Sequence, residues 1–180
     1  MNVLLFTPAV DDRAGIGKIS SRIGLAREAI AFAKSDNLFD ETEQRHEEKL
    51  LDGGKGIACV LVDEAQFLEP TQVMDLTLVA DRLSIPVLCY GLRTDFRGEP
   101  FGGSRYLLAW ADELIEIKTI CHSGKKATMN ARLDKDGNRV WEGKQIEIGT
   151  NYVSLSRKEF QLDRVSPVNR DLDIAEVSNP

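Results

Sequence analysis

Long hydrophobic runs and disulfide-forming cysteines are both scarce in this sequence. No apolar stretch approaches the ~20 residues that a membrane-spanning helix requires, so we expect no membrane-spanning segment. The apolar residues 2–6 are followed by aspartates and lack a basic flank, which predicts a buried strand rather than a signal peptide. The three cysteines, Cys59, Cys89 and Cys121, are odd in number and widely spaced. We therefore expect no disulfide framework and a cytoplasmic protein.

Positive charge is also in deficit. Lysine and arginine number 23 against 29 aspartates and glutamates, for a formal net charge of −6, which argues against a nucleic-acid-binding surface. Hydrophobic residues make up 42% and charged residues 29%, a balance that excludes a wholly disordered chain. A length of 180 residues suits one domain with a small appendage.

Three nearly continuous apolar runs in the first half are typical of strands that are covered on both faces, as in a parallel sheet: 2–6, 57–62 and 85–90. Between the last two, apolar residues recur at helical spacing over 70–83, and Pro70 suits the first turn. The segment 57–90 is therefore predicted to be one right-handed βαβ unit. We expect the charged run 41–50 to be the solvated face of a helix.

After residue 102 the apolar runs become short and alternating. They predict one helix followed by β-strands: 104–111, 114–121, 127–133 and 139–148. An Asp-Gly step within 134–138 predicts a hairpin turn. We therefore expect an α/β domain over 1–118, a small β-rich domain over 119–161 and a flexible polar tail over 162–180.

The run 59–67 carries the clearest chemical signal. A buried parallel strand that ends in Asp63 and Glu64 places two carboxylates at the edge where open α/β sheets bind ligands. In phosphoryl-transfer folds the aspartate at this place holds magnesium, and an adjacent glutamate can take a proton from the attacking oxygen. The alternative is an acidic strand end in solvent. The same Asp-Glu-Ala-Gln string also occurs in ATPases that act on nucleic acid, which the acidic net charge disfavours.

Three further segments fall near that edge. The loop 91–103 follows the next strand and combines glycine, arginine and phenylalanine, which suits a ligand loop; the alternative is a flexible surface loop. Residues 11–13 follow the first strand, and Arg13 could meet a phosphate. The run 15–18 contains Gly-Ile-Gly-Lys but lacks the full spacing of a phosphate loop.

Several of these runs together resemble the type II thymidine kinases of bacteria and large phages. The similar segments follow one another in order: 11–13, 20–25, 60–68, 86–101, 113–129 and 152–160. The resemblance implies a P-loop, RecA-like α/β domain and a small β-rich, zinc-ribbon-like domain. It also implies transfer of the γ-phosphate of ATP to the 5′-hydroxyl of thymidine with Mg²⁺, in a cytoplasmic tetramer without nucleic-acid or membrane partners.

The resemblance also implies roles for individual residues. Glu64 corresponds to the general base, and Asp63 to the acid on the magnesium side. Asp11 and Arg13 correspond to residues beside the phosphates. The nucleoside-binding wall corresponds to Phe67, Leu92, Phe96, Phe101, Met129 and Tyr152, with Met129 near the thymine methyl group and Tyr152 following the loop that reads the base edge.

Two departures from the family pattern stand out. Residue 1 aligns with the family's second strand, so the first strand and the phosphate loop have no counterpart here. We therefore expect an N-terminally truncated domain that does not phosphorylate thymidine as written, either because a start site was misassigned or because the chain is a non-catalytic remnant. Of the four zinc-ligand positions only Cys121 is a thiolate ligand; the others are Ser123, Ser156 and Glu159, so we expect zinc to be lost. The neighbouring His122 is expected at the surface.

Overall fold

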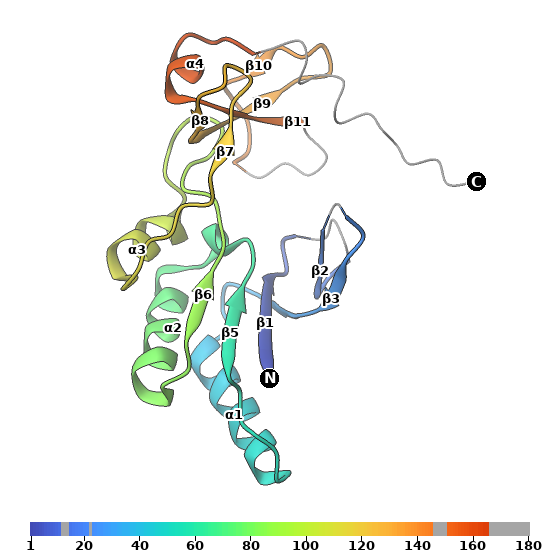
Figure 1. Cartoon of the computed structure of the whole chain (residues 1–180), viewed down its shortest axis with the longest axis vertical. Helices are drawn as coiled ribbons and strands as arrows, with labels where there is room; N and C mark the ends of the chain where they lie inside the picture. Colours follow the sequence, from blue (N-terminus) through green and yellow to red (C-terminus); the bar gives the residue numbers. More distant parts are fainter. Residues whose placement is uncertain (12–14, 22, 146–150, 166–180) are drawn as a thin grey trace, which may run out of the picture. The chain divides into compact units, whose positions relative to one another are not determined.

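The computed structural model describes residues 1–11, 15–21, 23–145 and 151–165, and these form two compact units (Figure 1). The first unit comprises Met1–Arg93 and Phe101–Leu114. The second comprises Thr94–Pro100 and the described residues from Ile115 onward. The segment Thr94–Pro100 lies inside the loop that the sequence assigned as a whole to the α/β domain, so that loop contributes to both units.

A parallel sheet forms the centre of the first unit. Among the described residues its strand order is β4-β1-β5-β6, with the bounds Ile30–Phe32, Val3–Pro8, Cys59–Val62 and Val87–Cys89. In register, Leu4 pairs with Val60, and Val60 pairs with Val87. The three strands predicted from apolar runs are confirmed as β1, β5 and β6.

The segment between β1 and the first helix departs from expectation. It forms a hairpin of β2 (Lys18–Ser20) and β3 (Ala26–Glu28), and then β4, which pairs in parallel with β1. These strands are three residues each, too short for a periodic sequence signal.

The helix α2 spans Pro70–Leu83, the range that the apolar spacing predicted. Glu69 and Gln72 form a reciprocal capping box at its start, and the chain leaves the helix at Ser84 in a left-handed conformation. The helix α1 (Leu38–Leu51) begins after Asn37, whose side chain accepts the N–H groups of Phe39 and Asp40. Most of the charged run in α1 is exposed, as predicted.

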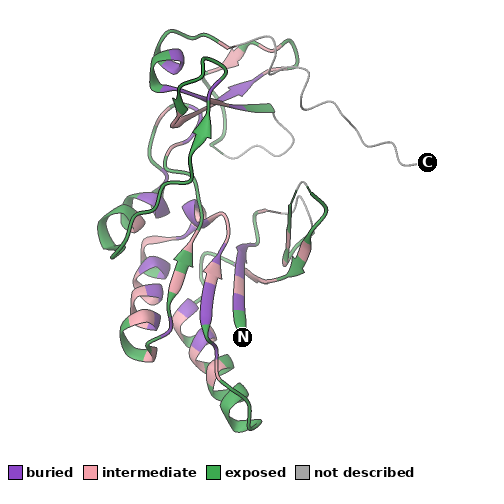
Figure 2. Ribbon diagram, in the orientation of Figure 1, coloured by how far each residue is buried: buried purple, intermediate pink, exposed green. Residues whose placement is uncertain are grey.

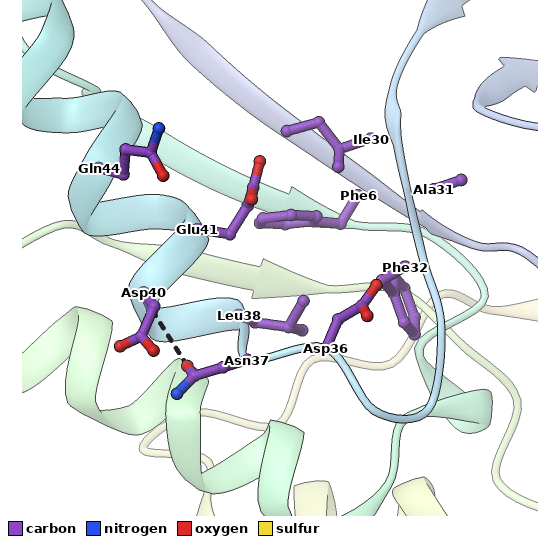
Figure 3. A pocket seen from close by; sticks show the side chains of 10 residues that line it. All are labelled: Phe6, Ile30, Ala31, Phe32, Asp36, Asn37, Leu38, Asp40, Glu41 and Gln44. Atoms are coloured by element: carbon purple, nitrogen blue, oxygen red, sulfur yellow. Dashed lines mark hydrogen bonds between the residues drawn. The ribbon is translucent and has the colours of Figure 1, made fainter.

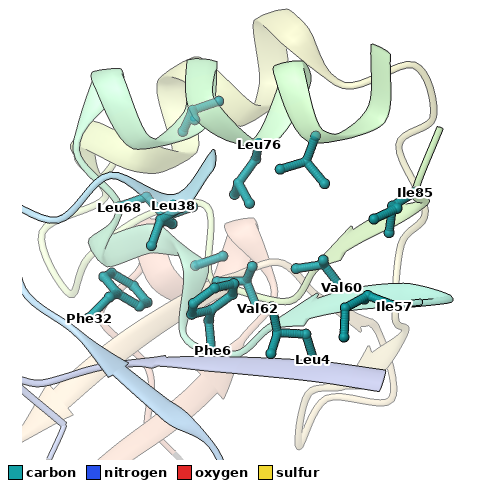
Figure 4. Packing of buried hydrophobic residues seen from close by; sticks show 13 residues of the cluster. Leu4, Phe6, Phe32, Leu38, Ile57, Val60, Val62, Leu68, Leu76 and Ile85 are labelled. Atoms are coloured by element: carbon teal, nitrogen blue, oxygen red, sulfur yellow. The ribbon is translucent and has the colours of Figure 1, made fainter. Parts of the chain in front are cut away.

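The hydrophobic core of the first unit lies between the sheet and these two helices (Figure 4). Leu4 and Phe6 of β1 and Val60 and Val62 of β5 point to the same side of the sheet. They pack with Leu38 of α1 and with three residues of α2: Val73, Leu76 and Val79. Burial of each such side chain contributes about 1.5–3 kcal/mol, so this layer fixes the strand ends that carry the candidate site.

Antiparallel strands build the second unit. They form one sheet of order β10-β9-β11 and a second pair β7-β8, with the bounds Arg139–Val140, Met129–Leu133, Asn151–Leu155, Thr119–Ile120 and Lys126–Ala127. The Asp-Gly hairpin is confirmed: Asp134 accepts the N–H groups of Asp136 and Asn138, and Gly137 has a φ of 77°. The strand predicted over 114–121 is confined to β7, and that over 139–148 to β10, with 146–148 outside the described residues.

Two helices complete the described elements. The helix α3 (Gly102–Trp110) covers the range predicted as 104–111 and belongs to the first unit. The short helix α4 (Arg157–Gln161) follows β11 in the second unit. Figure 2 shows that burial is concentrated along β1, β5 and the inner sides of α1 and α2. None of the helices formed by described residues is long and apolar enough to cross a bilayer.

Candidate functional site

The carboxyl ends of β1, β5 and β6 lie at the same edge of the parallel sheet, and Asp11, Asp63 and Glu64 follow those ends. The Asp63 N–H donates to the Phe6 carbonyl at 2.9 Å, and the Ala65 N–H donates to the Tyr90 carbonyl at 2.8 Å. The end of β5 is therefore hydrogen-bonded to both neighbouring strands. Asp11 donates its N–H to the Pro8 carbonyl at 3.0 Å in the turn after β1. Arg13, predicted beside it, lies outside the described residues.

Glu64 has an unusual backbone. Its φ of 47° and ψ of 40° are left-handed, and it directly precedes the 3₁₀ turn η1 (Ala65–Phe67). For a residue with a Cβ this conformation costs about 1–2 kcal/mol and is held only when the surroundings enforce it. Ser84 and Asp163 also have positive φ, so this conformation alone does not identify a site. Glu64 combines it with a position at the carboxyl end of β5, where the sequence placed the candidate base.

Two glycines allow neighbouring segments to pack closely against η1. A Cβ placed on Gly91 would lie 2.7 Å from Gln66 Oε1 and 2.9 Å from the Gln66 backbone nitrogen. A Cβ on Gly103 would lie 2.7 Å from the Leu68 carbonyl oxygen. Both contacts are shorter than side chains tolerate, so the loop after β6 and the start of α3 can close on η1 only with glycine at these positions.

The buried side chain of Gln66 joins these parts. Its Nε2 group donates to Glu64 Oε2, and its Oε1 atom accepts the Leu92 N–H at 3.0 Å. The Leu92 carbonyl in turn accepts the Ser104 hydroxyl at 2.6 Å. Sequence reasoning missed Gln66, Gly91, Gly103 and Ser104. Gln66 stands within the run 59–67 that carried the chemical signal, and the two glycines stand within the loop 91–103.

Three of the predicted nucleoside-wall residues belong to the first unit. Phe67 and Phe101 meet edge to face, with ring centroids 5.7 Å apart and an interplanar angle of 84°. Phe101 is buried, Phe67 is half-buried and Leu92 is 46% exposed. The first unit therefore offers partly accessible apolar side chains close in sequence to the carboxylate pair.

The remaining wall residues, Phe96, Met129 and Tyr152, belong to the second unit. Phe96 is 1% exposed, and the Arg132 guanidinium carbon lies 3.8 Å from its ring centroid. Met129 packs against the core of this unit, and Tyr152 on β11 is exposed.

Asp95 organises the loop segment that joins the second unit. This buried carboxylate accepts the backbone N–H groups of Arg97 and Glu99 and the side chains of Arg97 and Gln145. Burial alone would raise the pKa of Asp95, but the Arg97 side chain and the other donors outweigh it and leave the pKa lowered.

The four predicted zinc-ligand positions all lie in the second unit. Burial raises the pKa of the Cys121 thiol, but donors of Ser123 and Ser156 outweigh burial and leave the pKa lowered. The Glu159 N–H donates to Ser156 Oγ at 3.3 Å. In the part of the chain that the structure describes, no three His, Cys, Asp or Glu residues gather as a metal site. His122 is exposed, as predicted.

A separate cavity of about 350 Å³ lies in the first unit between β4 and the start of α1 (Figure 3). Phe6 and Phe32 supply apolar walls, whereas Asp36, Asp40 and Glu41 are acidic. Carboxylates repel phosphate oxygens, so the cavity does not suit a triphosphate. The Gly15–Lys18 run leads into β2 of a hairpin rather than into a helix, so it is not a phosphate loop.

Comparison with known proteins gives consistent matches. The family model described as thymidine kinase matches residues 1–160. A thymidine kinase of Coxiella burnetii is 56% identical over 164 residues, which cover 90% of this chain and 81% of that protein. A thymidine kinase of Photobacterium profundum is 53% identical over 163 residues, 89% of this chain and 82% of that protein. One of Legionella pneumophila is 56% identical over 163 residues, 89% of this chain and 76% of that protein.

Proposed function

Because the chain belongs to the thymidine kinase family, we propose that it transfers the γ-phosphate of ATP to the 5′-hydroxyl of thymidine. The observation that carries this proposal is the Asp63–Glu64 pair at the carboxyl end of β5, with Glu64 in a left-handed conformation beside a turn that two glycines approach closely. A ligand at this edge of the sheet would meet both carboxylates.

Glu64 is the proposed general base. Its carboxylate would accept the proton of the 5′-hydroxyl as the hydroxyl oxygen bonds to the γ-phosphorus and the ADP oxygen leaves. The transition state of this transfer is loose, so the protein contributes chiefly alignment and charge stabilisation. A backbone fixed by its two neighbouring strands suits that task.

Asp63 is the proposed residue on the magnesium side. Mg²⁺ in such sites is held by one or two carboxylates, with phosphate oxygens and water completing its shell, and it neutralises charge on the transferring phosphoryl group. A single aspartate beside the base fits this donor set. Asp11 and Arg13 are proposed beside the phosphates, from their position after β1.

The thymidine wall is proposed to use Phe67, Leu92 and Phe101 from the first unit. The edge-to-face contact of the two phenylalanines supports this assignment, because a flat base is best enclosed by rigid apolar side chains. For Phe96, Met129 and Tyr152, which belong to the second unit, the nucleoside-binding role stays a prediction from the resemblance. We also propose that this unit folds without zinc, because Ser123, Ser156 and Glu159 occupy three of the four predicted ligand positions and neutral serines are poor zinc ligands.

The experiment is steady-state phosphorylation of thymidine by the 180-residue chain with ATP and Mg²⁺, compared with its Glu64→Gln variant. Loss of the base should lower kcat by about 10²–10⁴-fold. Glu69→Gln is the matched control, because Glu69 caps α2 and pairs with Lys34 rather than with the site. A loss below tenfold in a folded Glu64→Gln protein would contradict the assignment. Thymidine binding without turnover by the unmodified chain would instead favour the nucleoside-binding remnant.

A further inference from the structure

Gln66 is almost completely buried, at 3% exposure, yet it uses both ends of its amide within the candidate site. One end meets the Glu64 carboxylate and the other meets the backbone of Leu92, in the loop after β6. The side chain therefore links the proposed base on one strand end to a proposed nucleoside-wall residue on the next.

The orientation of this amide follows from its partners. The Leu92 N–H can only donate, so the amide oxygen must face it, at 3.0 Å. The NH₂ group is then left to face Glu64 Oε2, where a carboxylate can only accept. A glutamine satisfies both partners at once, and the reversed amide would satisfy neither.

The loop after β6 packs closely against this amide. A Cβ on Gly91 would lie 2.7 Å from Gln66 Oε1, so the strand end passes directly against the amide oxygen. Buried polar groups without partners are costly, which holds the amide in this one orientation.

We propose that Gln66 is a positioning residue that sets the Glu64 carboxylate and the Leu92 backbone in a fixed relation, so that the base and the bound nucleoside are aligned together. This inference rests on the proposed function. The donor half of the amide orients the carboxylate that takes the proton and therefore acts on kcat. The acceptor half fixes the loop that carries Leu92 and therefore acts on the KM for thymidine.

Two substitutions of Gln66 separate the effect of the donor half of the amide from that of the acceptor half. Gln66→Glu keeps the size and an oxygen that accepts the Leu92 N–H, but it presents a carboxylate where Glu64 needs a donor. We expect kcat to fall by about 10²-fold, since small misplacements of a reacting group have effects of that size, with KM for thymidine within about twofold of the unmodified chain. Gln66→Met removes both hydrogen bonds, so kcat should fall and KM should rise by about tenfold.

A matched control is available in the same unit. Gln72 is also a buried glutamine with both amide ends bonded, to the Ala33 and Asp36 carbonyls and to the Glu69 N–H. Gln72→Met should lower thermal stability while kcat and KM stay unchanged. Equal losses of kcat in Gln72→Met and Gln66→Met would show that general destabilisation, rather than positioning, explains the effect.

A double-mutant cycle supplies the decisive readout. If Gln66 acts through Glu64, Gln66→Glu should lower kcat in the unmodified chain but by less than about threefold in the Glu64→Gln background, where there is no carboxylate base to orient. Full additivity, or a folded Gln66→Glu protein with kcat within threefold of the unmodified chain, would overturn the proposal. Because Gln66→Glu preserves volume, it decides the matter even if Gln66→Met fails to fold.

Different results would contradict the role of Gln66 and the proposed function. A chain that turns over no thymidine contradicts the proposed function. The acceptor half is then tested by calorimetry with thymidine as the probe, where Gln66→Met should weaken binding about tenfold and Gln66→Glu should not. Equal thymidine affinity of all three proteins, or an absence of thymidine binding by the unmodified chain, would overturn the inference.

Discussion

The two units of this protein are stabilised in different ways. The first unit buries hydrocarbon side chains between a parallel sheet and two helices, with Phe6, Val60, Val62 and Val79 fully enclosed. The second unit has a smaller apolar core, made of Cys121, Ala131, Leu133, Val153, Leu155 and Phe160. Buried or partly buried arginines take the place of further hydrocarbon there.

These arginines act as flat packing elements. The Arg139 guanidinium carbon lies 3.5 Å from the Trp141 ring centroid and 3.7 Å from that of Phe160. Arg132 covers Phe96 and donates to the Glu142 and Lys144 carbonyls at 2.7 and 2.9 Å. A small β-rich unit cannot bury enough apolar surface by itself, so directional contacts account for more of its stability. We therefore expect the largest losses of stability in the first unit from truncation of buried apolar side chains. In the second unit we expect them from substitution of polar side chains.

The chain provides one reporter for each unit, because its two tryptophans are Trp110 in α3 and Trp141 in the second unit. Trp141→Phe leaves fluorescence from the first unit, and Trp110→Phe leaves it from the second. All stability measurements below use these two backgrounds.

The largest effect should come from Phe6→Ala. Phe6 is fully buried on β1, and removal of its ring should lower the free energy of unfolding by about 3–5 kcal/mol. Urea unfolding followed at Trp110 measures this loss. The exposed Val3 on the same strand supplies the control, because Val3→Ala should change stability by no more than about 0.5 kcal/mol. A Phe6→Ala loss under 1 kcal/mol would contradict the assignment of the core.

The second effect is Arg132→Met, which keeps an apolar stem but removes two hydrogen bonds and the contact with Phe96. We expect a loss of about 2–3 kcal/mol, reported by Trp141. Arg157→Met, on an exposed arginine of α4, should leave stability nearly unchanged. If both substitutions were neutral, arginine packing would not distinguish the units.

The third effect is pH-dependent and concerns Asp95. Its pKa is lower in the folded protein, so its stabilising contribution is present above the unfolded value of about 3.9 and is lost as pH falls through the lower folded value. Asp95→Asn should therefore lower stability by about 2 kcal/mol at pH 7, and the difference from the unmodified chain should shrink below about pH 4. Urea unfolding at Trp141 between pH 3 and 7 tests this. A pH-independent difference would contradict the linkage.

The smallest effect should be that of metal removal. A structural zinc site contributes about 10–16 kcal/mol of metal-linked folding free energy, but Cys121 is the one thiol among the four predicted ligand positions. Dialysis against a chelator should therefore shift the unfolding temperature by less than about 1 °C. Elemental analysis of protein purified without added zinc accompanies the measurement. One zinc per chain, with unfolding on its removal, would show that the ligands lie elsewhere.

Local patterns predicted much of the first unit. Apolar runs gave β1, β5 and β6, and three-and-four spacing with Pro70 gave the bounds of α2, because those signals arise from contacts close in sequence. The placement of Thr94–Pro100 in the second unit could not be predicted this way. It depends on Phe96 meeting Arg132 and on Asp95 meeting Gln145, pairs far apart in the chain.

The candidate site also has features that the sequence predicted and features that it did not. The position of Asp63 and Glu64 at a strand end followed from the sequence, because a buried apolar run stops there. The left-handed backbone of Glu64 did not, since glutamate has no preference for that conformation. The close approach of Gly91 and Gly103 to the adjoining turn is likewise visible only in the fold.

At Glu64, the residue that would be best for stability differs from the residue that the proposed activity requires. Glycine would adopt this conformation without the strain that glutamate carries, about 1–2 kcal/mol. A library selected only for heat resistance should therefore accept glycine at this position, whereas one selected for growth that depends on phosphorylated thymidine should retain the acid. The identity of the residue recovered would report which pressure acted.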